Sequence, residues 1–256
     1  MNNIYVGDGI EERVHNPCFP AHFRMLIVGQ SGCGKTCLLM KLLLEPNLLN
    51  YKKLYVFARS LYQPQYKVLK SGIENKLPKE DIIRLLNSTN LCKEYNRTVD
   101  EVAIGLSNDN EENDIPPSDI EGEFNTNAGD IPDPSDLDMS IRNLIVFDDI
   151  LTDSNQTTAE NYYTRGRSAN CDAIYLSQNY TRLPLHTIRS NANFMIFFKS
   201  SPLTVDQLFR NFASVDMNLN DFKEFCKKAW GIKHGYIIID LSREYGNGRY
   251  RSNLFL

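Results

Sequence analysis

Hydrophobic residues along the chain occur mainly in short runs separated by segments of helical spacing. Strand-length runs lie at 25–28, 53–58, 143–149, 173–178, 193–198 and 235–241. Helical spacing occurs at 37–44, 79–86, 158–167 and 203–230, whereas 61–70 fits neither pattern. Alternating strands and helices predict an α/β fold with a mainly parallel central sheet covered by helices on both faces.

One stretch departs from this alternation. Residues 98–141 contain 13 Asp and Glu residues and no Lys or Arg, and beyond Leu106 their apolar residues stand alone. We expect a disordered or loosely ordered acidic insertion, either a solvated spacer or a regulatory flap or DNA mimic. The rest divides into an N-terminal arm at 1–22 and one domain formed by 23–97 and 142–256.

The acidic residues at 98–141 offset a positive net charge on the rest of the chain. The formal net charge is −4, but outside 98–141 the chain has 28 basic and 19 acidic residues, a net of +9. Such a body suits a polyanionic partner such as nucleic acid. On charge alone, an ordinary mixed surface explains it equally well.

The cysteines and the apolar runs exclude several classes of protein. None of the six cysteines forms a C-x-x-C pair, which indicates a reducing compartment and not a disulfide framework or a zinc site. Residues 1–12 lack the features of a signal peptide, and no apolar run approaches the length of a membrane span. We therefore expect no membrane association and no secretion.

The first strand-length run leads into a glycine-rich turn. From Gly29 to Thr36 the sequence reads G-x-x-x-x-G-K-T, the phosphate-binding P-loop or Walker A motif. Successive N–H groups and the following helix start form a positive site for phosphates. Lys35 should reach the β- and γ-phosphates of ATP, and the Thr36 hydroxyl should bind Mg²⁺. The expected nucleotide contacts are Gly29, Gln30, Ser31, Gly32, Cys33, Gly34, Lys35, Thr36 and Cys37.

Two later strands end in polar residues suited to the same site. The run at 143–149 ends in Asp148 and Asp149, as a Walker B strand does. Asp148 should hold Mg²⁺ through water, and Asp149 occupies the position that polarises the attacking water. Gln178 ends the next strand, where many motor ATPases have a γ-phosphate sensor. The constellation predicts a P-loop NTPase, a RecA/ASCE-like three-layer sandwich.

Four segments form a combined pattern: GQSGCGKT at 29–36, LIVFDD at 144–149, TRGRSANCDAIYLSQNY at 164–180 and LPLHTIRSNANFMIFFK at 183–199. Together they resemble the FtsK–HerA superfamily of DNA-pumping ATPases. Within that superfamily they are most similar to the poxvirus-type genome-packaging ATPases of large DNA viruses, virophages and Polinton-like elements. The resemblance implies a homo-oligomeric ring, a hexamer or pentamer, that threads double-stranded DNA into a capsid. It also implies a capsid or portal partner, and a location in the cytoplasm, the viral factory or the virion.

In that family an arginine from the neighbouring subunit completes the ATP site. Arg167 is the first candidate, Arg165 the second and Arg189 the third; the alternative is that they contact DNA phosphates or form intrachain pairs. The chain departs from the family at Asp149, where Glu is common, and at Ser168, where His is common.

Three other functions remain open. A P-loop GTPase should have N-K-x-D after a strand, whereas the chain has only Asn75-Lys76-Leu77-Pro78. A nucleotide kinase could use Arg165 and Arg167 as a lid, but no acceptor pocket is evident. The third is an ATPase of the same superfamily in DNA replication or partition. A non-enzymatic scaffold is disfavoured by the intact Lys35, Thr36, Asp148 and Asp149.

Overall fold

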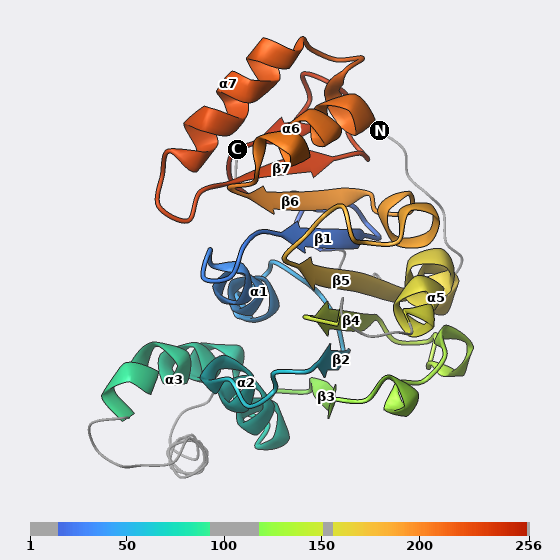
Figure 1. Ribbon diagram of the computed structural model, residues 1–256. Helices are drawn as coiled ribbons and strands as arrows, with labels where there is room; N and C mark the ends of the chain where they lie inside the picture. Colours follow the sequence, from blue (N-terminus) through green and yellow to red (C-terminus); the bar gives the residue numbers. More distant parts are fainter. Residues whose placement is uncertain (1–14, 93–117, 151–155, 255–256) are drawn as a thin grey trace.

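The computed structural model describes residues 15–92, 118–150 and 156–254, in which eight strands form one sheet (Figure 1). The strands are β1 (Arg24–Val28), β2 (Lys53–Ala58), β3 (Glu121–Asn125), β4 (Asn143–Asp148), β5 (Cys171–Ser177), β6 (Phe194–Phe198), β7 (Tyr236–Asp240) and β8 (Tyr250–Arg251). Their order is β3-β2-β4-β5-β1-β6-β7-β8. The pairs from β3 to β6 are parallel, and only β7 and β8 join antiparallel. The prediction of a mainly parallel sheet is confirmed.

Helices cover both faces of this sheet. One face packs against α1 (Lys35–Leu44), α2 (Pro64–Glu74) and α3 (Lys79–Cys92). The other packs against α5 (Thr157–Arg165), α6 (Pro202–Leu208) and α7 (Leu219–Trp230). The chain therefore has the expected three layers. No helix of the described residues combines the length and apolar character that crossing a bilayer requires.

Short helical turns join these elements. The 3₁₀ turns are η2 (Ala128–Asp130), η3 (Pro134–Asp136) and η4 (Gly166–Ala169), and the π turns are η5 (Leu185–Arg189) and η6 (Phe209–Ala213). Some helix bounds differ from the sequence prediction, and α3 extends from the expected 79–86 to Cys92. The helix expected at 158–167 ends at Arg165 and continues as η4, and the ambiguous stretch at 61–70 contains the start of α2.

Strand β1 shows why the sheet needs two helical layers. Met25 and Ile27 lie in the core beneath α1, whereas Leu26 and Val28 lie in the core on the opposite face. A strand buried on both faces is a continuous apolar run, and this is how 25–28 reads. Burial fixes the strand firmly, so the loop that follows Val28 starts from a rigid position.

The register of the strands brings three strand ends together. Val28 at the end of β1 pairs with Ser177 of β5, and Asp148 at the end of β4 pairs with Leu176 of β5. Strand β5 thus lies between the P-loop strand and the strand that carries the aspartates. Because parallel strands end at the same edge, everything that directly follows β1, β4 and β5 meets there. This strand order agrees with the predicted ASCE-like fold.

The expectation of a disordered insertion over 98–141 is wrong for 118–141. Residues 121–125 form β3, which pairs in parallel with β2 at the sheet edge. Ile131 and Leu137 are buried in the core on the α5 face. An edge strand is held by backbone hydrogen bonds, so a few apolar anchors suffice where the sequence pattern looked too sparse for a core. Residues 98–117 lie outside the described residues.

The described part of the N-terminal arm is packed on the domain. His15 is buried, and its Nε2 lies 2.8 Å from Oδ2 of Asp172 at the start of β5. Phe19 is buried in the core on the α1 face. Residues 15–22 are therefore part of the domain's packing, and residues 1–14 lie outside the described part of the chain.

Candidate functional site

The P-loop adopts the geometry that its sequence predicts. Gly34 has φ of 108°, a left-handed conformation that favours glycine, and caps the N-terminus of α1. A Cβ on Gly29 would lie 2.7 Å from Cβ of Phe198, so the loop has no room for a larger residue there. Lys35 Nζ donates to the carbonyl oxygens of Gly29 at 2.7 Å and Gln30 at 3.0 Å. The ammonium group therefore lies inside the curve of the loop.

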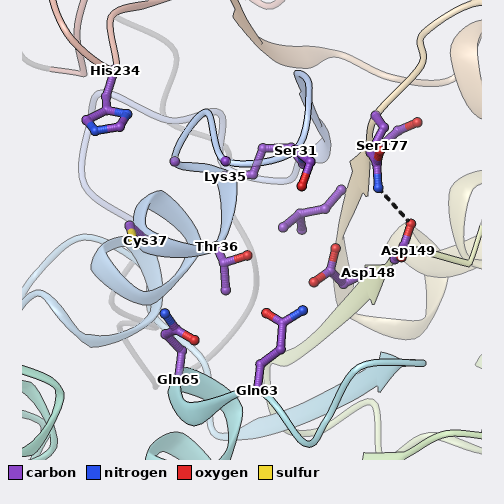
Figure 2. Close-up of a pocket in the computed structure, with 14 residues that line it drawn as sticks. Ser31, Lys35, Thr36, Cys37, Gln63, Gln65, Asp148, Asp149, Ser177 and His234 are labelled. Carbon is purple, nitrogen blue, oxygen red and sulfur yellow. Dashed lines mark hydrogen bonds between the residues drawn. The ribbon is translucent and has the colours of Figure 1, made fainter. Parts of the chain in front are cut away.

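A cavity of about 320 Å³ opens beside this loop (Figure 2). The P-loop side of the cavity is lined by Ser31, Gly32, Gly34, Lys35, Thr36 and Cys37. The remaining lining is Gln63, Gln65, Asp148, Asp149, Leu176, Ser177, Gln178 and His234. Of the predicted nucleotide contacts, Gly29, Gln30 and Cys33 do not line it. Gly29 and Gln30 instead border a neighbouring cavity of about 230 Å³, which Gln178 also lines.

The two aspartates occupy different environments. Asp148 is 7% exposed and accepts a hydrogen bond from the Tyr66 hydroxyl at 2.6 Å. Burial raises the pKa of Asp148 above its usual value, although the Tyr66 hydrogen bond and Lys35 oppose this. Burial, with Asp148 nearby, raises the pKa of Tyr66 far above its usual range. The phenol is therefore a firm donor to this carboxylate.

Asp149 is exposed and has φ of 55°. This left-handed conformation is uncommon for residues other than glycine, although Asp tolerates it better than most. It turns the chain sharply at the end of β4. The Asp149 Oδ1 then accepts a hydrogen bond from Gln178 Nε2 at 3.3 Å, marked by the dashed line in Figure 2. The structure thus joins two residues that the sequence placed on separate strands.

The residues present suit a magnesium ion bound with a nucleotide. The Thr36 hydroxyl and the Asp148 carboxylate are hard oxygen ligands, and both line the cavity. Among the described residues, no group of three or more His, Cys, Asp or Glu side chains could hold a metal by itself. Mg²⁺ commonly binds through one or two protein oxygens together with substrate phosphates and water. The donor set therefore fits Mg²⁺ that arrives with ATP.

Sequence reasoning missed Gln63, Gln65 and His234, which line the cavity, and Tyr66, which contacts Asp148. Gln63, Gln65 and Tyr66 come from the loop and first turn after β2, whose last residue, Ala58, pairs with Asp148. A helix start after a parallel strand was a usable signal, but the sequence did not show that β2 lies beside β4. His234 gave no signal at all, because it follows α7 and lies about 200 residues from the P-loop.

His234 links the C-terminal part of the chain to the P-loop. Its Nδ1 lies 3.0 Å from the Cys33 carbonyl oxygen. A carbonyl oxygen only accepts, so the geometry assigns the proton to Nδ1. The ring also lies close to Gly34, where a Cβ would be 3.4 Å from Nδ1. His234 therefore packs directly on the residue that caps α1.

The three candidate arginines lie away from this cavity. Arg165 ends α5, Arg167 lies in η4 before the start of β5, and Arg189 lies in η5 before β6. Strand β5 has 7 residues, and at about 3.3 Å per residue its N-terminal and C-terminal ends are roughly 20 Å apart. The arginines lie at the N-terminal ends of the parallel strands, and the P-loop lies at their C-terminal ends. In Figure 1, α5 accordingly lies at the end of the sheet opposite α1. None of the three can reach the P-loop of its own subunit.

Their local contacts differ. Arg165 Nη2 lies 2.8 Å from Oδ2 of Asp133, so it forms an intrachain pair. The Arg189 guanidinium lies 5.0 Å from the centroid of the Tyr180 ring. Arg167 is exposed, and within residues 15–92, 118–150 and 156–254 its side chain forms no hydrogen bond or ion pair. Of the three, Arg167 is the most available to a partner.

Comparison with known proteins gives distant likenesses only. No protein-family model matches the chain, and no curated protein matches it. The genome-packaging NTPase B204 of Sulfolobus turreted icosahedral virus 2 is 10% identical, with a TM-score of 0.46 over 86% of this chain and 92% of that chain. VirB4 of Thermoanaerobacter pseudethanolicus is 12% identical, with a TM-score of 0.47 over 86% and 87%.

A third solved structure, the DNA-packaging ATPase B204 of Sulfolobus turreted icosahedral virus, is 12% identical, with a TM-score of 0.43 over 85% and 92%. Because these sequence identities and TM-scores are low, the fold assignment rests on this chain's own geometry. That geometry consists of the P-loop at the end of β1, the paired aspartates at the end of β4 and the intervening strand β5. The chain therefore has the fold of a P-loop NTPase.

Proposed function

We propose that the chain is a Mg²⁺-dependent ATPase that moves double-stranded DNA as a homo-oligomeric ring and packages a viral genome into a capsid. The observation that carries the proposal is that the candidate site residues lie at opposite ends of the parallel strands. Lys35, Thr36, Asp148, Asp149 and Gln178 line one cavity, whereas all three candidate arginines lie at the opposite edge. One subunit holds half of an ATP site and offers the missing cation to a neighbour.

Each residue of the cavity has a role that its position suggests. Lys35 and the loop N–H groups would hold the β- and γ-phosphates, and Thr36 and Asp148 would hold the Mg²⁺ ion that binds with the nucleotide. When bound, Mg²⁺ neutralises charge on the phosphate oxygens. Asp149 orients and polarises the attacking water, and Gln178 couples to it through the hydrogen bond at 3.3 Å. Asp149 is one methylene shorter than Glu, and its left-handed backbone directs the shorter side chain toward Gln178.

The arginine of a neighbouring subunit would complete this site. A guanidinium near the γ-phosphate stabilises the charge that develops during transfer. Arg167 fits best, because it is exposed at the far edge and has no carboxylate partner within the described chain. An isolated monomer should consequently be a poor ATPase.

The DNA and packaging parts of the proposal depend on the sequence. Support comes from the four segments that resemble the viral packaging ATPases. A ring of five or six subunits, a capsid or portal partner and a location in the cytoplasm, viral factory or virion complete the proposal. The motif resemblance applies equally to an ATPase of DNA replication or partition, and both roles require the DNA translocation that the following assay measures.

The direct test is ATP hydrolysis with double-stranded DNA of increasing length. A translocase should show turnover that rises with DNA length, because a longer track supports more steps before dissociation. Lys35→Ala should abolish hydrolysis while leaving the unfolding curve unchanged. Stimulation by a small-molecule phosphate acceptor instead of DNA would identify a kinase, and GTP-specific turnover without DNA stimulation would identify a GTPase.

The shared site has its own test. Mixing Arg167→Ala subunits with Lys35→Ala subunits should restore part of the activity, because some interfaces then combine an intact P-loop with an intact arginine. Mixtures of Arg165→Ala with Lys35→Ala are the matched comparison, because Arg165 is held by Asp133. Mixed rings that assemble but show no complementation would refute Arg167 as the neighbour's contribution.

A further inference from the structure

One wall of the nucleotide cavity comes from the start of α2. Gln63 and Gln65 line the cavity there, and Tyr66 follows directly in the first turn of the helix. Tyr66 is fully buried, and the residues behind it, Val68 and Leu69, are buried in the core as well. The backbone of this wall is thus anchored, while its first polar side chains face the nucleotide cavity.

The hydrogen bond of Tyr66 differs from those of three other buried tyrosines. Tyr51, Tyr162 and Tyr163 each donate their hydroxyl to a backbone carbonyl, which satisfies a core tyrosine without affecting any site. Tyr66 instead donates to Oδ2 of Asp148 at 2.6 Å, from 82 positions away in the sequence. A buried tyrosine needs an acceptor, and here the acceptor is the candidate metal carboxylate.

This contact limits how Asp148 can act. The Tyr66 hydroxyl occupies one of the two lone pairs of Oδ2. Oδ1 and the second lone pair of Oδ2 would hold the metal or its water shell. The short hydrogen bond from the fully buried Tyr66 also restrains the torsion of the carboxylate, because the phenol itself has no room to move. Groups that bind a metal ligand from behind commonly orient it and tune its affinity.

We propose that Tyr66 is a positioning residue for the metal-bound nucleotide, acting through Asp148, and that the start of α2 is part of the ATP site. The inference rests on the proposed function, because it needs Asp148 to serve the metal. It assigns to Tyr66 the role of holding the carboxylate ready before Mg²⁺–ATP arrives. Removing the hydroxyl should therefore weaken binding of the metal complex specifically, not nucleotide binding in general.

The test measures nucleotide affinity with and without metal. A fluorescent non-hydrolysable ATP analogue is titrated into the full chain in EDTA and in saturating Mg²⁺, and the ratio of the two Kd values gives the metal-dependent gain. Tyr66→Phe keeps the ring and loses only the hydroxyl. It should reduce the metal-dependent gain by about tenfold and leave Kd in EDTA unchanged. Tenfold is the lower end of the loss in metal affinity seen when a residue that hydrogen-bonds a metal ligand is replaced.

Tyr51→Phe is the matched control, because it removes a buried hydroxyl that donates to the Leu43 carbonyl at 2.8 Å. It should leave both Kd values unchanged. A double-mutant cycle supplies the second measurement: in an Asp148→Asn background, Tyr66→Phe should have no further effect on the gain, because the two residues act as a unit. Additive effects would show that Tyr66 acts elsewhere.

The outcomes separate the two proposals. Equal weakening in EDTA and in Mg²⁺ would make Tyr66 a structural residue and overturn the inference, as would an unchanged gain in Tyr66→Phe. A wild-type chain that binds the analogue without any metal-dependent gain would overturn the metal role of Asp148 itself. Absence of any nucleotide binding in the wild type would overturn the proposed function.

Discussion

A buried carboxylate fastens the N-terminal segment to the sheet, and its removal tests how much this contact contributes to stability. Asp172 is 1% exposed at the start of β5. Its Oδ2 accepts from His15 Nε2 at 2.8 Å and from Arg142 Nη1 at 3.2 Å, and its Oδ1 accepts from the Phe23 N–H at 2.9 Å. Three segments distant in sequence therefore meet on one negative charge.

The pKa of Asp172 gives the magnitude. Burial acts to raise it, but the neighbouring His15 and His22 side chains and the Phe23 N–H outweigh burial and lower the pKa from 3.8 to about 2. At about 1.4 kcal/mol per pKa unit, this difference corresponds to roughly 2–3 kcal/mol of folding free energy. The unfolded chain binds the proton more tightly than the folded one. The contribution is thus fully present above pH 3.8 and is lost as the pH falls through about 2.

The perturbation is Asp172→Asn, which preserves the shape of the side chain and removes its charge. Urea unfolding of both proteins, followed by the fluorescence of Trp230 and by circular dichroism, gives the free energy of unfolding at several pH values. We expect the variant to be less stable by at least about 2 kcal/mol at neutral pH. The difference in unfolding free energy between the two proteins should narrow by about 2 kcal/mol as the pH falls from 5 to 2. The wild type loses the stabilising charge of Asp172 over this range, whereas the variant has no such charge to lose.

Asp138→Asn is the control, because Asp138 also has a lowered pKa, caused by hydrogen bonds from Ser140, but lies exposed on the surface. Its stability should stay close to that of the wild type. A gap between wild type and Asp172→Asn that stays constant from pH 5 to pH 2, with equal urea dependence, would refute the reasoning. Equal stability at neutral pH would refute it as well.

Three further changes test other contacts. Gly29→Ala should weaken nucleotide binding at least tenfold in a binding titration, because its Cβ would lie 2.7 Å from Phe198 Cβ; unaltered Kd would show that the loop adapts. Gly72→Ala should lower unfolding free energy by about 1–3 kcal/mol, because its Cβ would lie 2.5 Å from Ile82 Cγ1; wild-type urea midpoints would contradict this. His234→Ala should raise the KM for ATP several-fold with kcat nearly constant, since the 3.0 Å contact with Cys33 orders the loop; an unchanged KM would exclude this role.

The sequence alone determined the parts of this protein that are local. The P-loop, its strand and its helix are contiguous, so eight residues and their flanks specified the turn, the position of Lys35 and the fold class. The predicted strands carrying Asp148 and Gln178 also appear in the structure, because a continuous apolar run that ends in polar residues is the pattern of a buried parallel strand. Sparse apolar residues misled the prediction at 118–141, because an edge strand is held by its backbone.

Only the tertiary structure decided which of these residues meet. The order of the strands brought Asp149 to Gln178 and Tyr66 to Asp148, and neither strand order nor register is written in any single segment. His234 reached the P-loop because α7 and β7 fold back beside β1 through β6, a path that depends on the whole sheet. The same topology put Arg167 at the far edge. Pairings between distant segments depend on packing the complete core, and for that reason local patterns identified the candidate site residues but not their partners.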